Sequence, residues 1–473
     1  MKTQARKEPQ NDLSSEMAGL QAEPRLVERA GKLLQGWRQK PGVGFPEIYE
    51  ASSELEAAYR FFSNPNVCFG TLIQAHSEKT KERCKAFKEV LVLEDTTEFC
   101  FGGKSQREGL SRINTNDQGF LGHFGFVVSG DGMRIPLGVV AAELYTRPVE
   151  KKALNRHKRR ESKGCESHRW GRMMEAVEKE LGGIVSAIHI MDREGDIYDV
   201  LANGIQKQRR FVIRAGMDRK VESDDPVFDL LFDALDGLPV ICRDNVHVSF
   251  REENSLPDKR KSHPSRRERV ADLSISATRV RLKRPRSSAK QYSASIELNV
   301  VHVFEANPPS GEQAIEWILL TNEPCSTPEE LRRVIAAYRT RWMIEEFFKA
   351  IKTGCAYEKR QLTSYHALKN VLGMTIPIAW EMLLLRTQAH QAQDIPAQGF
   401  IDPLRIEILK ARSKRYPLTD NPSLRDVCYA IAGLGGHIKY NGPPGWLTLR
   451  RGYEKLLFAE EIWKLARESY DQS

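Results

Sequence analysis

The chain has 473 residues, of which 40% are hydrophobic and 29% charged. This composition is typical of a globular protein with two to four domains and excludes a largely disordered or fibrous chain. Lys and Arg outnumber Asp and Glu by 72 to 63, giving a net charge of +9, which is compatible with a nucleic-acid partner without requiring one.

The eight cysteines form no CxxC pair and are spread along the chain, which excludes a disulfide framework or a cysteine zinc site. The first residues contain no apolar core of the kind that a signal peptide has. The longest apolar stretch, around 376–385, contains Glu381 and is shorter than a bilayer requires. We therefore expect a cytoplasmic protein that does not cross a membrane.

Residues 1–24 are polar and poor in aromatic residues, and we expect them to be disordered. From 25 to 70, apolar residues recur at helical spacing, which predicts a small helical domain. Its exposed Lys and Arg would suit a groove of DNA. A helical cap on the following domain is the alternative interpretation.

Residues 71–237 predict a mixed α/β sheet, because helical and apolar segments alternate. A helix over 70–90 precedes three candidate strands, and a helix ending at Gly182 and Gly183 precedes two more; the candidate strands cover 90–93, 120–129, 135–145, 184–191 and 209–216. Between them, 151–163 holds seven Lys or Arg and a single acid, Glu161. A solvated loop and a phosphate-contacting segment both fit this charge run.

Residues 238–305 alternate apolar and polar side chains, which predicts an inserted antiparallel β-unit. Residues 306–375 return to a buried strand followed by a long helix. Ser326 or Thr327 would cap this helix, Pro328 would occupy its first turn and Gly354 would end it. Residues 376–473 are mostly helical in pattern.

The long helix carries a polar stripe. At about 100° per residue, a set of five polar side chains falls within roughly 80° of arc: Tyr338, Arg341, Glu345, Lys349 and Lys352. Apolar residues fall on the opposite side. We expect the helix to rest on its apolar face and to present the stripe outward. A solvated amphipathic helix with ordinary i,i+4 pairs would show the same stripe.

Two aspartates end strongly apolar strand candidates, Asp95 after "VLVLE" and Asp192 after "IVSAIHIM". A single aspartate in such a place is more often a helix cap or a turn residue. Together with Glu345, however, they would supply three carboxylates from separate elements, and three carboxylates can hold a pair of Mg²⁺ ions for in-line phosphoryl displacement. Arg341 and the two lysines of the stripe would then clamp phosphate.

Several motifs occur in a family-specific order. They are "AYRFFSNPNV" (58–67), "EDTTEF" (94–99), "DREGDIY" (192–198), "YRTRWMIEEFFKAIKTG" (338–354) and "AIAGLGGHIKYN" (430–441). The fourth contains Y-x-x-R-x-x-x-E. With them, the sequence resembles bacterial insertion-sequence transposases of the IS4 type.

The resemblance implies an RNase H-like (DDE) catalytic core with a β-insertion at 238–305, between helical end-binding (25–70) and dimerisation (376–473) domains. It implies Asp95, Asp192 and Glu345 as the ligands of two Mg²⁺ ions, with Mn²⁺ as a substitute. The implied partners are the double-stranded DNA of transposon ends and target, and a second copy of the chain in a synaptic dimer. The implied location is the bacterial cytoplasm, at the nucleoid when DNA is bound.

The resemblance also implies the DNA contacts. Arg214 would touch DNA near the cleavage point, and Trp317 would stack on a base flipped from the transposon end. Tyr338 and Arg341 would hold the nearby backbone, with Lys349 and Lys352 beside them. From the residues alone, Trp317 fits strand packing as well, and Arg214 fits a strand-edge salt bridge.

Three functions remain open at this stage. The first is cut-and-paste DNA transposition, with nicking, hairpin formation, hairpin opening and strand transfer at one site. The second is an RNase H-like nuclease that cuts without joining. The third is a non-catalytic DNA-binding protein, which the presence of all three carboxylates disfavours.

Overall fold

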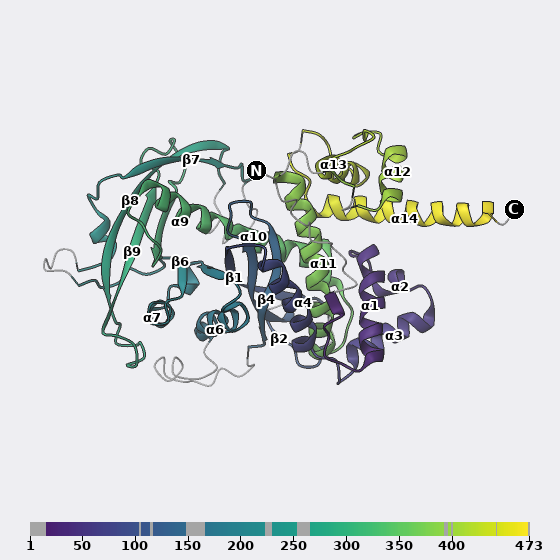
Figure 1. Ribbon diagram of the computed structural model, residues 1–473, viewed down its shortest axis with the longest axis horizontal. Coiled ribbons are helices and arrows are strands. Elements are labelled where there is room, and N and C mark those ends of the chain that lie inside the picture. Colours follow the sequence, from purple (N-terminus) through teal and green to yellow (C-terminus); the bar gives the residue numbers. More distant parts are fainter. Residues whose placement is uncertain are drawn as a thin grey trace, which may run out of the picture.

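The computed structural model describes residues 16–103, 106–113, 117–147, 166–222, 229–252, 265–391, 396–398, 401–440 and 442–471. A ten-stranded mixed sheet with helices on both faces forms its centre (Figure 1). The mixed α/β architecture predicted from the strand order is thereby confirmed. The basic stretch 151–163 lies outside the described residues.

Four of the strands are packed around β1 (Glu89–Phe101). β1 pairs antiparallel with β3 (Gln118–Ser129), which pairs antiparallel with β4 (Pro136–Tyr145). On its other side β1 pairs parallel with β5 (Ser186–Met191), and β5 pairs parallel with β6 (Arg210–Arg214). The spatial order is therefore β4-β3-β1-β5-β6, and the short β2 (Ser111–Arg112) extends the β3 edge.

The alternating segment at 238–305 forms three antiparallel strands, as predicted: β7 (Cys242–Val248), β8 (Arg269–Lys283) and β9 (Ser295–Phe304). They are not a separate unit. β10 (Glu316–Thr321) pairs antiparallel with both β9 and β6, so the insertion continues the central sheet. The reason is that an alternating strand still has free edge hydrogen-bonding groups, which the edge of the central sheet satisfies.

The sheet has two covered faces, and residue parity along each strand decides which face a side chain joins. Leu91 and Leu93 pack with helices α9 (Pro328–Thr340), α10 (Trp342–Lys349) and α11 (Tyr365–Gln391). Val90 and Val92 pack against α6 (Arg169–Leu181) on the other face, where α7 (Tyr198–Gln206) also lies. Any polar residue at an odd position of β1 beyond Leu93 therefore faces α9 and α10.

The long helix begins as predicted. Thr327 caps it, its hydroxyl accepts from the backbone N of Glu330, and Pro328 occupies the first turn. The helix is interrupted at Arg341, whose backbone N bonds to the carbonyl of Tyr338 instead of continuing the α pattern. It ends in a π-turn, Ala350–Gly354.

The N-terminal helices are α1 (Pro24–Gln39), α2 (Phe45–Ile48), α3 (Ser52–Ser63) and α4 (Phe69–Cys84). The expectation that residues 1–24 are disordered is wrong for 16–24. Met17 is 1% exposed, and buried Glu16 accepts hydrogen bonds from His76 (2.6 Å) and Arg83 (2.5 Å). Polar composition hid this, because the buried carboxylate is compensated by partners distant in sequence. Residues 1–15 lie outside the described residues.

A buried arginine joins the N-terminal helices to the rest of the protein. Arg360 donates to the backbone carbonyls of Val43 (2.5 Å), Pro41 (3.2 Å) and Cys355 (3.0 Å), and its guanidinium lies 4.6 Å from the ring centre of Trp37. Burial lowers the pKa of Arg360 to about 10. Carbonyl oxygens from two separate segments therefore solvate one charge, which fixes the α1–α2 loop against the π-turn.

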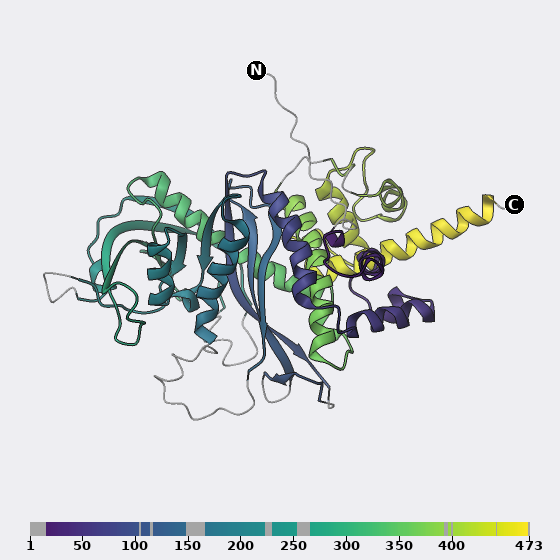
Figure 2. The same cartoon turned by 60° about the horizontal axis from the view of Figure 1, so that its bottom comes forward.

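The C-terminal part contains α11, α12 (Pro403–Arg412), α13 (Leu424–Leu434) and α14 (Trp446–Asp471), and α14 projects away from the body (Figure 2). The boundary expected at 376 falls inside α11, a single helix. α11 is longer than the apolar stretch suggested, and its segment Tyr365–Thr387 is long and apolar enough to cross a membrane. That segment is 83% buried inside the protein, and core helices of globular domains pass the same test.

Candidate active site

Three polar residues follow buried strand residues at one level of the sheet. Leu93 pairs with Ile190, and Met191 pairs with Ile213. Continuing this register places Asp95, two residues after Leu93, level with Asp192, and Asp192 level with Arg214, on neighbouring strands that are about 4.8 Å apart.

The sequence suggested that Asp95 ends its strand, but in the structure the strand continues past it. β1 continues to Phe101 along β3, and only its parallel partner β5 ends there. Asp95 and Asp192 share parity with Leu93 and Ile190, so they belong to the face that α9 and α10 cover. Both carboxylates therefore lie at the level of the sheet where β5 ends.

The helix contributes the third carboxylate. Arg341 lies at the interruption between α9 and α10, and its guanidinium donates to Asp95 Oδ2 (3.0 Å) through Nη1 and to Glu345 Oε1 (2.9 Å) through Nη2. The four-residue spacing of Arg341 and Glu345 places them on one side of the helix. One side chain thus brings together two carboxylates that are remote in the sequence.

The electrostatics of Asp95 are those of a crowded acidic site. Burial and the neighbouring Asp192 raise the pKa of Asp95 to about 7, and the opposing charge of Arg341 limits the rise. The Asp95 side chain is 18% exposed and that of Glu345 is 30% exposed, so both carboxylates are accessible from solvent. Asp192 also accepts from the backbone N of Glu194 (2.8 Å), so the helix-cap interpretation of this aspartate holds as well.

The three carboxylates fit a divalent cation by their chemistry. They are hard oxygen donors that Mg²⁺ prefers, and the raised pKa of Asp95 shows that they repel one another unless a positive charge compensates them. Arg341 provides that charge between Asp95 and Glu345. Among the residues that the structure describes, no group of three His, Cys, Asp or Glu side chains is arranged to hold a metal ion as placed.

The structure places Trp317 on β10, half-buried, with its ring centre 5.9 Å from that of Tyr338. Tyr338 is only 6% exposed, so the expectation that it points outward is wrong. It belongs to the face of α9 that packs on the sheet, where its ring contacts that of Trp317. Arg214 donates to the backbone carbonyl of Glu316 (2.8 Å), which links β6 to the Trp317 strand.

The two lysines of the stripe do not reach the carboxylates. Lys349 donates to Glu346 (2.7 Å) and lies 5.8 Å from the ring centre of Trp342. Lys352 lies 3.8 Å from Glu358. Exposed Lys349 and half-buried Lys352 flank the site without contacting Asp95 or Glu345, and the outward direction predicted for the stripe holds for these two.

Sequence reasoning missed Trp342. It directly follows Arg341 and is 52% exposed, which is unusual for the largest apolar side chain. A weak signal was present, because Trp342 falls about 40° from Tyr338 on the helix and thus just beyond the edge of the predicted stripe. An exposed aromatic face beside paired carboxylates and arginines suits contact with a base or a sugar.

A second overlooked set ties the loops of the site together. Arg169, at the start of α6, donates to Thr96 Oγ1 (2.9 Å) and pairs with Glu194. Fully buried Asp196 accepts from the backbone N of Gly216 (2.8 Å) and of Met217 (3.0 Å). These contacts fix the loops that follow β5 and β6, and therefore the positions of the side chains at their ends.

The raised pKa of Asp95 predicts how stability depends on pH without metal. The folded protein retains a proton that the unfolded chain has lost between pH of about 4 and about 7, so stability falls as pH rises through that window. We expect Asp95→Asn to remove this fall, so that at pH 8 its free energy of unfolding is higher than that of the unsubstituted protein by about 1–3 kcal/mol. Urea unfolding in EDTA at pH 5 and pH 8 measures this free energy for both proteins. Equal pH dependence in both proteins would contradict the prediction.

Comparison with known proteins identifies the N-terminal segment. Residues 15–67, which contain α1, α2 and α3, match a family model described as transposase DNA-binding. The match covers less than half of the chain. It supports the interpretation of the protein as a transposase, but it assigns no function to the residues outside this segment.

Among solved structures, the chain is similar to a piggyBac transposase synaptic complex with hairpin DNA, at 10% sequence identity. The similarity covers 80% of this chain and 71% of that one, with a TM-score of 0.34. At that identity and TM-score, the likeness alone establishes neither fold nor activity.

Proposed function

We propose that the protein is a DNA transposase of the IS4 type, resembling the Tn5 transposase in particular, with its active site at Asp95, Asp192 and Glu345. The observation that carries this proposal is that one guanidinium, that of Arg341, binds both Asp95 and Glu345, with Asp192 in register beside Asp95. The transposase DNA-binding match over residues 15–67 supports DNA as the partner.

The topology of the central sheet supports an RNase H-like core. Its strands β4-β3-β1-β5-β6 comprise three antiparallel strands followed by two that are parallel to β1. The proposed catalytic aspartates lie on β1 and just after β5, and the glutamate lies on a helix that packs over them. The remaining strands, β7 to β10, would then be the β-insertion of the family.

Asp95, Asp192 and Glu345 would hold the catalytic cations, which we propose to be a pair of Mg²⁺ ions. When bound, such ions supply Lewis-acid assistance to phosphodiester exchange and neutralise charge on the reacting oxygens. The same site would then serve nicking, hairpin formation, hairpin opening and strand transfer. Each step replaces one P–O bond with another, and the steps differ only in whether water or a DNA 3′-hydroxyl attacks.

The side chains around the carboxylates supply DNA binding. Arg214 and Arg341 present guanidinium groups, whose planar donors match phosphate oxygens. Trp317 and Trp342 present aromatic faces on either side of Arg341, one on β10 and one on α10. We propose that they stack on bases that leave the duplex while a strand bends sharply at the cut.

Assembly into a synaptic homodimer is proposed through the C-terminal helices. The outer part of α14 exposes a row of apolar side chains, with exposures of 63% at Phe458, 50% at Ile462 and 60% at Leu465. A projecting helix with such a face is unstable alone in water and suits a partner. On this proposal the protein acts in the bacterial cytoplasm, at the nucleoid.

The test is a cleavage assay with Mg²⁺ and DNA that carries the inverted repeats flanking this gene. We expect nicked, hairpin and strand-transfer products in time order. Linear products without hairpin or joined DNA would point to a nuclease instead. Tight end binding with no cleavage in Mg²⁺ or Mn²⁺ would contradict an enzymatic role altogether.

A further inference from the structure

The antiparallel strands β7 to β10 join the rest of the central sheet through a short ladder. Within the described residues, β10 pairs with β9 from Glu316 to Thr321, but with β6 only from Leu319 to Thr321. The facing side chains are mostly apolar, so a shift of β10 by two residues, which keeps every side chain on its own face, would still pack. Such a shift would move Trp317 by about 7 Å along β6. Apolar packing along this ladder therefore specifies its register only weakly.

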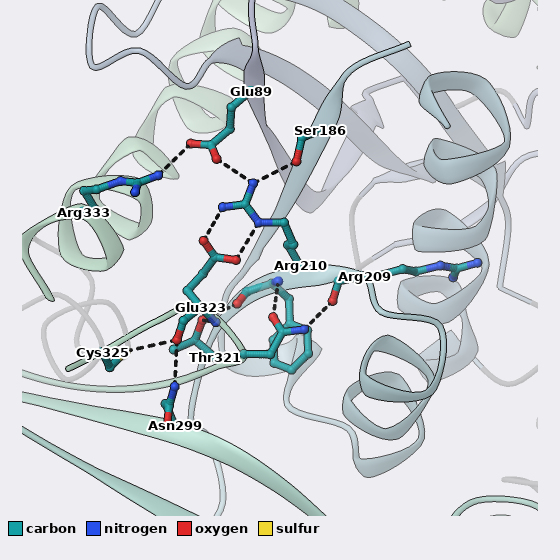
Figure 3. Close-up of polar contacts among 11 residues, drawn as sticks. Glu89, Ser186, Arg209, Arg210, Asn299, Thr321, Glu323, Cys325 and Arg333 are labelled. Carbon is teal, nitrogen blue, oxygen red and sulfur yellow. Dashed lines mark hydrogen bonds and ion pairs between the residues drawn. The ribbon is translucent and has the colours of Figure 1, made fainter. Parts of the chain in front are cut away.

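A buried ion pair specifies the register at one end of the ladder (Figure 3). Continuing the pairing of Thr321 with Val212 places Glu323 opposite Arg210. The two side chains form a two-point contact there, from Nε to Oε1 at 2.8 Å and from Nη2 to Oε2 at 2.5 Å. Glu323 is 7% exposed, so either charge would be costly to leave without the other.

The residue before Glu323 replaces a backbone pair with its side chain. Asn322 Oδ1 accepts from the backbone N of Phe211 (3.0 Å), and Asn322 Nδ2 donates to the backbone carbonyl of Arg209 (2.7 Å). A strand residue within an antiparallel ladder makes the same two kinds of bond with its own N–H and C=O. The side chain of Asn322 thereby extends the β6–β10 ladder beyond its last backbone pair, in the observed register.

The same end of β10 is tied to three other elements. The backbone carbonyl of Glu323 accepts from Asn299 Nδ2 of β9 (2.8 Å). Arg210 also donates to Glu89 of β1 (2.6 Å), and Glu89 lies 3.4 Å from Arg333 of α9. The hydrogen bond to Glu323, and after it that to Glu89, raise the pKa of Arg210. This end of β10 is therefore fixed against β9, β1 and α9 together.

The opposite end of the ladder carries side chains of the proposed active site. Arg214 lies four residues after Arg210 on β6, which is about 13 Å along the strand, and shares its face. Trp317 lies six residues before Glu323 on β10, and its ring centre is 5.9 Å from that of Tyr338. The register that is set at Glu323 therefore decides where the ring of Trp317 lies relative to β6 and α9.

We propose that Arg210, Asn322 and Glu323 form a register clamp and are positioning residues for Trp317. They act over about 20 Å of strand, by holding β10 in the register that puts the ring of Trp317 against Tyr338. The placement of Trp317 by the register clamp rests on the contacts described above. Its consequence for hairpin formation rests on the proposed function.

Glu323→Gln tests the register clamp. Glutamine keeps the shape of the side chain but replaces one acceptor oxygen with a donor, which breaks the two-point contact with Arg210. We expect the variant to fold, because Arg210 retains its bond to Glu89. Hairpin formation should slow by roughly 5- to 50-fold, without exceeding the effect of Trp317→Ala, while nicking changes by less than about threefold.

A second variant and a control accompany it. Arg210→Lys keeps the charge but lacks the planar fork, so we expect a smaller slowing of the same step. Glu297→Gln makes the same substitution as Glu323→Gln on the neighbouring strand β9, at a partly exposed carboxylate that pairs with Arg281 of β8 (3.1 Å). This control should leave nicking and hairpin formation unchanged.

A double variant separates positioning from a general loss of structure. If Glu323 acts through Trp317, adding Glu323→Gln to Trp317→Ala should slow hairpin formation no further. Hairpin formation is timed in Mg²⁺ from pre-nicked DNA that carries the inverted repeats flanking this gene. If the two substitutions multiply each other's effect, Glu323 acts on the fold in general, and the proposal is overturned.

The second readout does not depend on activity. The full chain labelled with fluorotryptophan gives fluorine NMR signals for its tryptophans, and Trp317→Phe identifies that of Trp317. We expect Glu323→Gln and Arg210→Lys to displace or broaden this signal and to leave that of buried Trp380 in place. An unchanged Trp317 signal in both variants overturns the proposal. A displaced signal in a protein that forms no hairpin would sink the proposed function and leave the register clamp standing.

Discussion

Glu345→Ala is expected to abolish DNA cleavage while leaving binding to transposon ends nearly unchanged. Glu345 lies on α10 with its carboxylate aimed at Arg341 and, through it, at Asp95. Removing it takes away one of three proposed cation ligands, and a catalytic cation contributes several kcal/mol to phosphodiester exchange. We expect a loss of roughly 10³-fold or more in the nicking rate. On the proposed function, end binding depends instead on α1 to α3, which match the transposase DNA-binding family and which Glu345 does not contact.

The control for this variant is Glu329→Gln, which changes an exposed glutamate in the first turn of α9. It should cleave DNA at the rate of the unsubstituted protein. Nicking is followed on denaturing gels, and end binding by mobility shift on the same DNA. Cleavage by Glu345→Ala within tenfold of the unsubstituted rate would contradict the assignment, and so would a matching loss in Glu329→Gln.

Trp317→Ala is expected to slow hairpin formation far more than the first nick. The hairpin requires a strand to turn back sharply, so a base must leave the stack, and an aromatic face offsets the lost stacking by about 1–3 kcal/mol. That energy corresponds to a slowing of roughly 5- to 150-fold in the hairpin step alone. The half-buried ring of Trp317, held against Tyr338, suits this role because part of its surface remains accessible.

Trp317→Phe is the matched control, because it retains an aromatic face and most of the packing on Tyr338. We expect it to restore much of the hairpin rate. A time course from pre-nicked DNA isolates the step. Should Trp317→Ala slow nicking and hairpin formation equally, packing within the sheet would explain its effect better than base stacking. Trp342→Ala then becomes the informative comparison, since its side chain is exposed and supports no core.

Much of the fold was predictable because it depends on local periodicity. Continuous apolar runs marked β1 and β5, strict alternation marked β8 and β9, and the Thr327 cap with Pro328 marked the start of α9. These signals survive folding because burial on one or both faces of a strand, and capping at a helix end, are decided within a few residues. The burial of Glu16 and Met17 was missed because the partners of Glu16, His76 and Arg83, lie more than fifty residues away in the sequence.

The sequence by itself singled out the residues that we propose to carry the chemistry: Asp95 and Asp192 beyond apolar runs, and Glu345 four residues after Arg341. Only the tertiary structure decided how they meet. Strand register put the two aspartates level, and packing of α9 on the sheet buried Tyr338 against Trp317, while both lysines bind other acids. Register and helix packing arise among segments remote in sequence, so no local pattern encodes them.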